Sequence, residues 1–153
     1  MSQFLFGFIG VGNMGGALAK AAAKMLPPEQ LLVSSRTTEK ASAFAAQLGC
    51  NAGDNAAVAA NCQYIFLGVK PQGMAAMLAD IAPVLADRSD RFILVTMAAG
   101  LTMEQIRSMA GGAYPVIRIM PNTPASIGAG MILYTTSNDV TDAECQQFLH
   151  GLS

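Results

Sequence analysis

The feature that most restricts the fold of this chain is a glycine-rich turn near its start. Gly10, Gly12 and Gly15 have the spacing G-x-G-x-x-G, and they join an apolar segment, 4–9, to an alanine-rich segment, 13–25. This spacing between a strand and a helix is typical of units that bind dinucleotides. The first glycine would allow a tight turn, the second would let the backbone approach a pyrophosphate, and the third would let the helix lie close to the sheet. The alternative is a structural turn that binds no ligand.

Strand-like and helix-like segments alternate along the rest of the chain. Several of the expected strands are continuous apolar runs, as in a parallel sheet that is covered on both faces. The expected strands are 4–9, 31–35, 63–69, 91–97, 113–120 and 131–135, and the expected helices are 13–25, 38–49, 56–60, 73–85, a helix that Thr102 caps and Gly111 closes, and 141–149. This order predicts an α/β domain of the Rossmann-like kind, with a doubly wound, mostly parallel sheet, helices on both faces and right-handed crossovers.

Length and composition exclude several classes of protein. A chain of 153 residues can bury one core, so residues 1–153 are expected to form one domain. The 9 lysines and arginines are scattered and the net charge is -1, which argues against nucleic-acid binding. No apolar run reaches the ~18 residues of a membrane span, so none is expected. The 3 cysteines have no metal-ligand spacing and there is 1 histidine, which argues against a metal site and favours a reduced, cytoplasmic protein.

The end of the second expected strand indicates which dinucleotide would bind. NAD-binding units carry an acidic residue here for the ribose 2′-hydroxyl, whereas this chain has Ser34, Ser35, Arg36 and Thr37. A carboxylate would repel a 2′-phosphate, but Arg36 and the hydroxyls would bind it through charge-assisted hydrogen bonds. The pattern therefore predicts NADP(H) as cofactor, with NAD(H) as the second choice. The alternative is that Arg36 is an exposed loop residue.

Small, polar or conformationally restricted residues also follow the later strands. In an open α/β sheet, ligands bind beyond the carboxyl ends of the strands, near the point where the strand order reverses. Lys70 is either a solvated loop residue or a contact to the cofactor or to an anionic substrate. Asn122 and Thr123 form either a proline-flanked turn or a polar contact to the nicotinamide carboxamide.

These segments together resemble the N-terminal domain of pyrroline-5-carboxylate reductase. The resemblance covers nearly all of the chain, and it is carried by five segments in the same order, 8–15, 35–37, 69–72, 98–100 and 118–124. Its most specific part is Val-Lys-Pro together with Met-Pro-Asn-Thr-Pro. It implies NADPH-dependent reduction of 1-pyrroline-5-carboxylate to L-proline, a step of proline biosynthesis.

The resemblance also implies the residues that contact the ligands. The implied cofactor contacts are Gly10, Val11, Gly12, Asn13, Met14, Gly15, Ser34, Ser35, Arg36, Thr37, Asn55, Val69, Lys70, Pro71, Ala98, Ala99 and Gly100. Pro121, Asn122 and Thr123 would lie on the substrate or nicotinamide side.

Members of that family continue into a helical C-terminal domain, which dimerises and supplies the substrate carboxylate site and a hydroxyl near the imine nitrogen. By this resemblance, the catalytic residues are expected after residue 153 and the full-length protein is expected to be a homo-oligomer. We therefore expect residues 1–153 to bind the cofactor but to be inactive alone.

Two other functions fit part of the pattern. A β-hydroxyacid dehydrogenase of the 3-hydroxyisobutyrate type shares the glycine turn and often has Arg-Thr after its second strand. A glycine-rich substrate loop would then be expected where this chain has Met120 to Pro124. The other alternative is a non-catalytic module that binds NADP.

Overall fold

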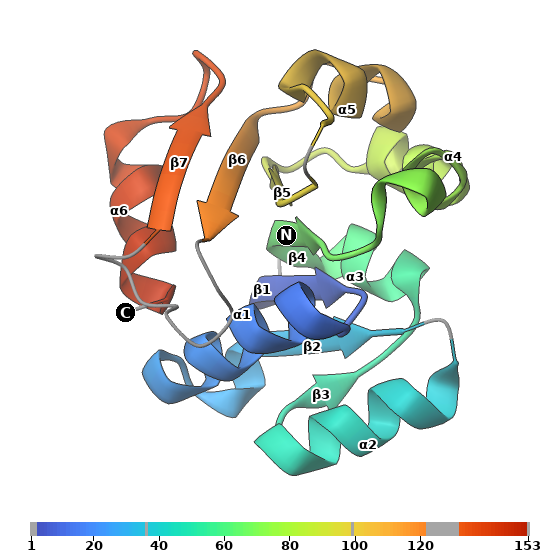
Figure 1. Ribbon diagram of the computed structural model, residues 1–153, viewed down its shortest axis with the longest axis vertical. Helices are drawn as coiled ribbons and strands as arrows, with labels where there is room; N and C mark the ends of the chain where they lie inside the picture. Colours follow the sequence, from blue (N-terminus) through green and yellow to red (C-terminus); the bar gives the residue numbers. More distant parts are fainter. Residues whose placement is uncertain (1–2, 36, 99, 122–131, 153) are drawn as a thin grey trace.

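The computed structural model describes residues 3–35, 37–98, 100–121 and 132–152, and these form one sheet with helices on both faces (Figure 1). The strands are β1 (Phe4–Ile9), β2 (Leu31–Ser34), β3 (Asn51–Ala52), β4 (Cys62–Leu67), β5 (Ile93–Thr96), β6 (Val116–Pro121) and β7 (Ile132–Thr136). The helices are α1 (Asn13–Met25), α2 (Thr38–Leu48), α3 (Asn55–Asn61), α4 (Pro71–Asp87), α5 (Met103–Ala110) and α6 (Asp142–Leu152), with a 3-10 turn η1 (Pro28–Gln30).

The sheet has 7 strands in the order β3-β2-β1-β4-β5-β6-β7. Neighbouring strands from β3 to β6 are parallel, and β7 is antiparallel to β6. The strand order reverses between β1 and β4, so this is the switch point at which an open α/β sheet offers a crevice for ligands. The predicted doubly wound α/β fold is thus confirmed.

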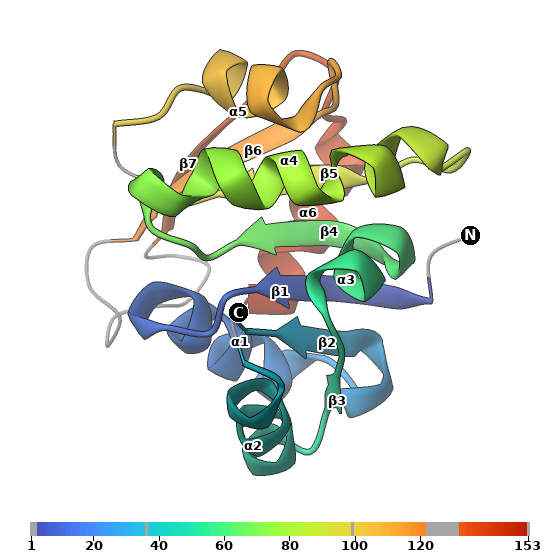
Figure 2. The same ribbon diagram turned by 90° about the vertical axis from the view of Figure 1, so that its right-hand side faces the viewer.

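Alternate residues of the strands enter two separate cores. Phe6 and Phe8 pack with α1, α2 and α6 on one face, and Ile9 packs with α3, α4 and α5 on the other (Figure 2). The first core holds a cluster of aromatic rings, in which Phe8 and Phe66 stack with centroids 4.3 Å apart. Helices cover both faces, which explains why the strands are continuous apolar runs in the sequence.

The second core contains the methionines of α4, Met74 and Met77, which are buried packing residues. Helix α4 starts at Pro71 and ends at Asp87, so the prediction of 73–85 was too short. Strand β4 ends at Leu67, before the predicted limit of 69, so Pro71 is separated from the strand. Pro71 lies at the first position of the helix, where its missing N–H needs no intrahelical partner.

Other element bounds also differ from the prediction. Strand β2 ends at Ser34, β5 is confined to Ile93–Thr96, and β6 begins at Val116. Two elements were missed, the two-residue edge strand β3 and the turn η1. Both are too short to show a hydrophobic period.

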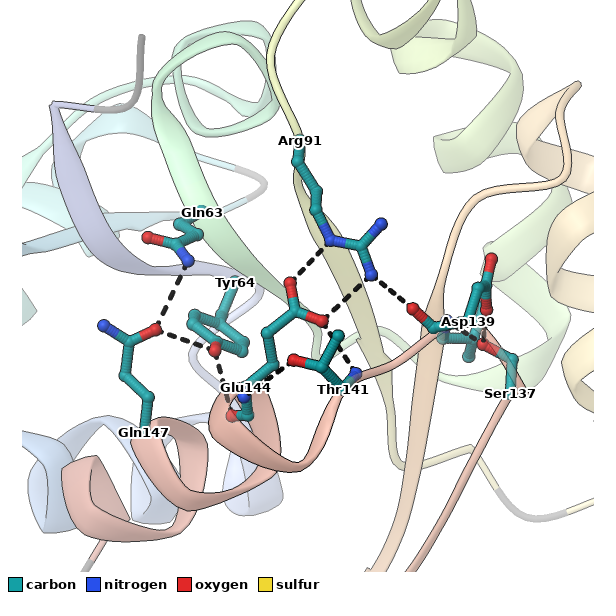
Figure 3. A network of polar contacts seen from close by, with 9 residues as sticks. Gln63, Tyr64, Arg91, Ser137, Asp139, Thr141, Glu144 and Gln147 are labelled. Atoms are coloured by element: carbon teal, nitrogen blue, oxygen red, sulfur yellow. Dashed lines mark hydrogen bonds and ion pairs between the residues drawn. The ribbon is translucent and has the colours of Figure 1, made fainter.

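A polar network fastens α6 to the amino ends of β4 and β5, as Figure 3 shows. The guanidinium of Arg91, just before β5, donates to both carboxylate oxygens of Glu144 over 2.6 and 2.9 Å. Glu144 in turn accepts from the backbone N–H of Thr141, and Thr141 accepts from the N–H of Glu144, so the start of α6 is capped reciprocally. The buried Tyr64 hydroxyl donates to the Glu144 carbonyl oxygen over 2.9 Å. The start of the last helix is therefore held at the amino ends of these strands, whereas the glycine turn lies at the carboxyl end of β1.

None of the helices within the described part of the chain is both long enough and apolar enough to cross a membrane.

Candidate dinucleotide-binding site

The glycine turn lies at the carboxyl end of β1, beside the switch point. Gly10 has φ +90, a conformation that L side chains rarely adopt. Its N–H donates to the carbonyl oxygen of Ser34 on one side over 3.0 Å. On the other side, the N–H of Gly68 donates to the carbonyl oxygen of Ile9 over 2.7 Å. The start of the turn is thus held between the ends of β2 and β4.

Gly15 and Gly68 both need to be glycine because they lie against the backbone of Gly10. A Cβ on Gly15 would stand 2.3 Å from the Gly10 carbonyl oxygen, and one on Gly68 would stand 2.5 Å from the same atom. Such separations are far below van der Waals contact. Helix α1 can therefore lie directly against the end of β1, as the third glycine of the motif predicts.

Gly12 differs from the other two glycines of the motif. Its φ of -71 suits any residue, and a Cβ built on it meets no heavy atom within 4 Å. Nothing in the described structure thus requires glycine here. The free space lies at the N-terminus of α1, whose first turn has neither a side-chain cap at Gly12 nor an acidic residue. The helix dipole and the uncapped N–H groups at this end of α1 favour a group that carries negative charge.

The residues at the end of β2 and just after it differ in exposure. Ser34 is 0% exposed and its hydroxyl donates to Oδ1 of Asn55 over 2.7 Å. Ser35 is partly exposed, and Thr37 is exposed although its hydroxyl accepts from the N–H of Lys40 and caps α2. Arg36 lies outside the described residues. Asn55 is the first residue of α3, so this helix is brought to the end of β2.

The other predicted contacts follow β4, β5 and β6. Val69 and Lys70 lie between β4 and α4, and Lys70 is exposed at the position that precedes the helix. After β5, Ala98 is buried and Gly100 has φ +84. Pro121 ends β6. Ala99, Asn122 and Thr123 lie outside the described residues.

The fold brings these segments to one edge of the sheet. In Figure 2, β1, β2 and β4 end at the same edge, which is also where α1 and α4 begin. The predicted glycine turn, the two serines at the end of β2 and the segment Val69–Pro71 therefore border one region at the switch point. Within the residues described here, no group of three or more metal-ligating side chains is found.

Two features of the site were not predicted from sequence. Gly68 was predicted only as part of a strand. Because it has no Cβ, the chain after β4 can lie directly against Gly10 in the turn. A glycine just after an apolar run and before Val-Lys-Pro was the available signal. The hydrogen bond from Ser34 to Asn55 joins residues 21 positions apart, and no local pattern indicates it.

Comparison with known families gives a match over more than half of the chain. Residues 5–100 match the family described as NADP oxidoreductase, coenzyme F420-dependent. This segment includes the glycine turn, the switch point and the strands up to β5.

Curated relatives match over almost the full chain. A pyrroline-5-carboxylate reductase of Escherichia coli (strain K12) is 37% identical over 147 residues, which are 94% of this chain and 54% of that protein. A pyrroline-5-carboxylate reductase of Corynebacterium melassecola is 32% identical over 95% of this chain and 54% of its own length. The chain thus spans about half the length of these relatives.

Solved structures confirm the fold. The crystal structure of Plasmodium falciparum pyrroline carboxylate reductase with NADP bound superposes with a TM-score of 0.75 and 22% identity. The superposition includes 100% of this chain and 56% of the Plasmodium falciparum chain.

Proposed function

This chain belongs to the NADP oxidoreductase, coenzyme F420-dependent, family, and we propose that it forms the NADP(H)-binding half of an enzyme that reduces 1-pyrroline-5-carboxylate to L-proline. The observation that carries the proposal is the open space at Gly12. The protein's own packing explains Gly10, Gly15 and Gly68, whereas a ligand at the N-terminus of α1 would explain why Gly12 carries no side chain. A pyrophosphate would be such a ligand.

The preference for NADP(H) rests on the residues that follow β2. Ser35 and Thr37 carry hydroxyls, Arg36 carries the positive charge, and no acidic residue stands among them. A 2′-phosphate would be bound by this set, whereas the 2′-hydroxyl of NAD(H) would lose the charge-assisted contact. NAD(H) is therefore the weaker cofactor in this proposal.

The substrate follows from the relatives and from the motif order. The curated relatives reported above are named pyrroline-5-carboxylate reductases. The segment Met120 to Pro124 also lacks the glycine-rich loop expected of a hydroxyacid dehydrogenase. Both observations favour a cyclic imine over a hydroxy acid as the substrate.

The chain's part in the reaction is to bind and orient. NADPH, when bound, supplies the hydride that reduces the carbon of the C=N bond. The glycine turn would hold the pyrophosphate and the residues after β2 would hold the adenosine end. Lys70, Ala98 to Gly100 and Pro121 to Thr123 would border the nicotinamide side. Such positioning lowers the activation barrier, because it holds the two reacting carbons in near-attack geometry.

The proton donor and the substrate carboxylate site are assigned to a second, helical domain of the full-length protein. The relatives are about twice as long as this chain, which leaves room for that domain. We propose that the full-length protein is a homo-oligomer and cytoplasmic. The free thiols of Cys50, Cys62 and Cys145 support a reducing compartment.

A hybrid protein tests this function. This chain, joined after Ser153 to the C-terminal half of the E. coli relative, should oxidise NADPH when 1-pyrroline-5-carboxylate is added. The unaltered E. coli protein is the positive control, and the hybrid with Gly12→Val is the negative control. A hybrid that folds and binds NADPH but does not oxidise it when 1-pyrroline-5-carboxylate is added would contradict the proposed function.

A further inference from the structure

Ser34 is fully buried, although it lies at the end of β2 beside the proposed cofactor site. We propose that Ser34 is a positioning residue, which holds the Asn55 amide so that Asn55 offers its nitrogen as a hydrogen-bond donor to the adenosine ribose end of the cofactor. The inference rests on the proposed NADP(H) site. It replaces the direct contact that the sequence resemblance implied for Ser34.

The geometry of the hydroxyl fixes which way the amide faces. Ser34 Oγ lies 2.7 Å from Oδ1 of Asn55 and 3.5 Å from the carbonyl oxygen of Phe8. A hydroxyl has one proton to donate, and the shorter of these two contacts is the stronger hydrogen bond. The proton of Ser34 is therefore donated to Asn55. Oδ1 of Asn55 is therefore held inward, which leaves Nδ2 on the other side of the amide.

The nitrogen of Asn55 is available for a ligand. Among the described residues, Oδ1 is the only atom of this side chain that has a hydrogen-bonded partner. The side chain is partly exposed, unlike Ser34. An amide nitrogen donates only, and the ribose oxygens and 2′-phosphate of NADP(H) accept, so the chemistry of the two groups agrees.

Ser34 also ties this donor to the glycine turn. Its carbonyl oxygen accepts from the N–H of Gly10 over 3.0 Å, and Ile9 is its partner in the β1–β2 register. The hydroxyl that orients Asn55 therefore has a fixed position relative to the turn that would hold the pyrophosphate. Such fixed orientation of a contact residue is what a binding site needs from its supporting residues.

Fluorescence titration with NADPH tests the role through a double-mutant cycle. Ser34→Ala should weaken binding about threefold to tenfold, the range of one neutral hydrogen bond. Asn55→Ala should weaken it at least as much, and the double variant should bind no more weakly than Asn55→Ala alone. Ser34→Thr, which keeps the hydroxyl, should restore most of the affinity. Asn61→Ala removes a side-chain hydrogen bond at the other end of α3 and should leave the affinity unchanged.

The outcomes of these measurements separate failure of this inference from failure of the proposed function. Wild-type protein that does not bind NADPH overturns the proposed function and this role with it. If the wild type binds NADPH, two outcomes overturn only the positioning role. In one, Ser34→Ala leaves the affinity unchanged. In the other, Ser34→Ala weakens NADPH binding by the same factor in the Asn55→Ala variant as in the wild type. The side-chain amide resonances of Asn55 in a ¹⁵N NMR spectrum provide a readout without cofactor. These resonances should shift in Ser34→Ala. Unmoved resonances in a folded Ser34→Ala protein would contradict the hydrogen bond between Ser34 and Asn55.

Discussion

Gly15 in α1 lies so close to Gly10 at the end of β1 that a Cβ on Gly15 would stand 2.3 Å from the Gly10 carbonyl oxygen. The obstacle is backbone, which cannot rotate away as a side chain can. The helix and the turn thus keep their places only while this position is glycine.

Gly15→Ala should therefore destabilise the protein. Alanine favours helix over glycine by up to about 1 kcal/mol. Overpacking against backbone costs about 1–3 kcal/mol, so the loss exceeds the gain. Gly73→Ala in α4 is the matched control, since a Cβ there meets nothing within 4 Å, and it should cause no loss. Urea denaturation of the two variants decides the matter, and equal stabilities would contradict the close contact.

Arg36→Asp should reverse the cofactor preference. The substitution removes a charge-assisted contact and places a carboxylate near the 2′-phosphate, so NADPH affinity should fall by several kcal/mol. NADH has no 2′-phosphate and should lose much less. Parallel titrations with both cofactors measure the difference. Equal losses would mean that Arg36 does not contact the 2′ position.

The ion pair between Arg91 and Glu144 should make stability depend on acid pH. The hydrogen bond from Arg91 is the main cause that lowers the pKa of Glu144 below its ordinary value of 4.5. A depressed pKa in the folded state stabilises the protein above the unfolded pKa, and this contribution is lost as pH falls through the folded value. The stability of the wild type should thus fall below about pH 5 as Glu144 is protonated. Arg91→Met lacks the ion pair at every pH, so this part of the pH dependence should be absent from it.

The size of this effect should be modest. The side chain of Arg91 is 49% exposed and that of Glu144 is 13% exposed, so solvent screens the pair. A contribution of at most about 1 kcal/mol is expected, and it should shrink in 1 M salt. Denaturation midpoints between pH 3 and 7 measure it. A constant difference between wild type and Arg91→Met over that range would show that the pair does not titrate as described.

The chain alone should bind NADPH without reducing 1-pyrroline-5-carboxylate at a useful rate. The residues assigned to the cofactor lie in this half, whereas the proton donor and carboxylate site are assigned to the second domain. Loss of substrate positioning can remove roughly 7–11 kcal/mol of barrier reduction. Absorbance of NADPH with excess substrate measures turnover. A rate on the order of 10 per second, that of a typical enzyme, would place the donor in this half, and Lys70 and Asn122 would be the first residues to mutate.

Sequence patterns predicted the fold best where strong local signals coincide. Strand 4–9 and helix 13–25 match β1 and α1 at both ends, because a continuous apolar run, a glycine turn and Pro27 mark their limits. Thr102 was also confirmed as the cap of α5, where Thr102 and Gln105 form a complete capping box. In each case, residues within a few positions of each other determine the element.

Contacts between distant segments could not be predicted in this way. Arg91 and Glu144 are 53 positions apart, and Ser34 and Asn55 are 21 apart, yet each pair fixes how two elements meet. The antiparallel direction of β7 was likewise not predicted. The short connection from β6 without a helical pattern was a usable signal, because parallel neighbours need a crossover of a dozen or more residues.

The central claim is that the bare backbone at Gly12 makes room for the pyrophosphate of NADP(H), and a titration of Gly12→Val tests it most directly. A Cβ at this position meets nothing within 4 Å, so the variant should fold with nearly unchanged stability. Calorimetric titration with NADPH should then show binding to wild type and none to Gly12→Val. A folded Gly12→Val protein that binds NADPH as tightly as wild type would show that the turn is structural only, and would contradict the proposed site.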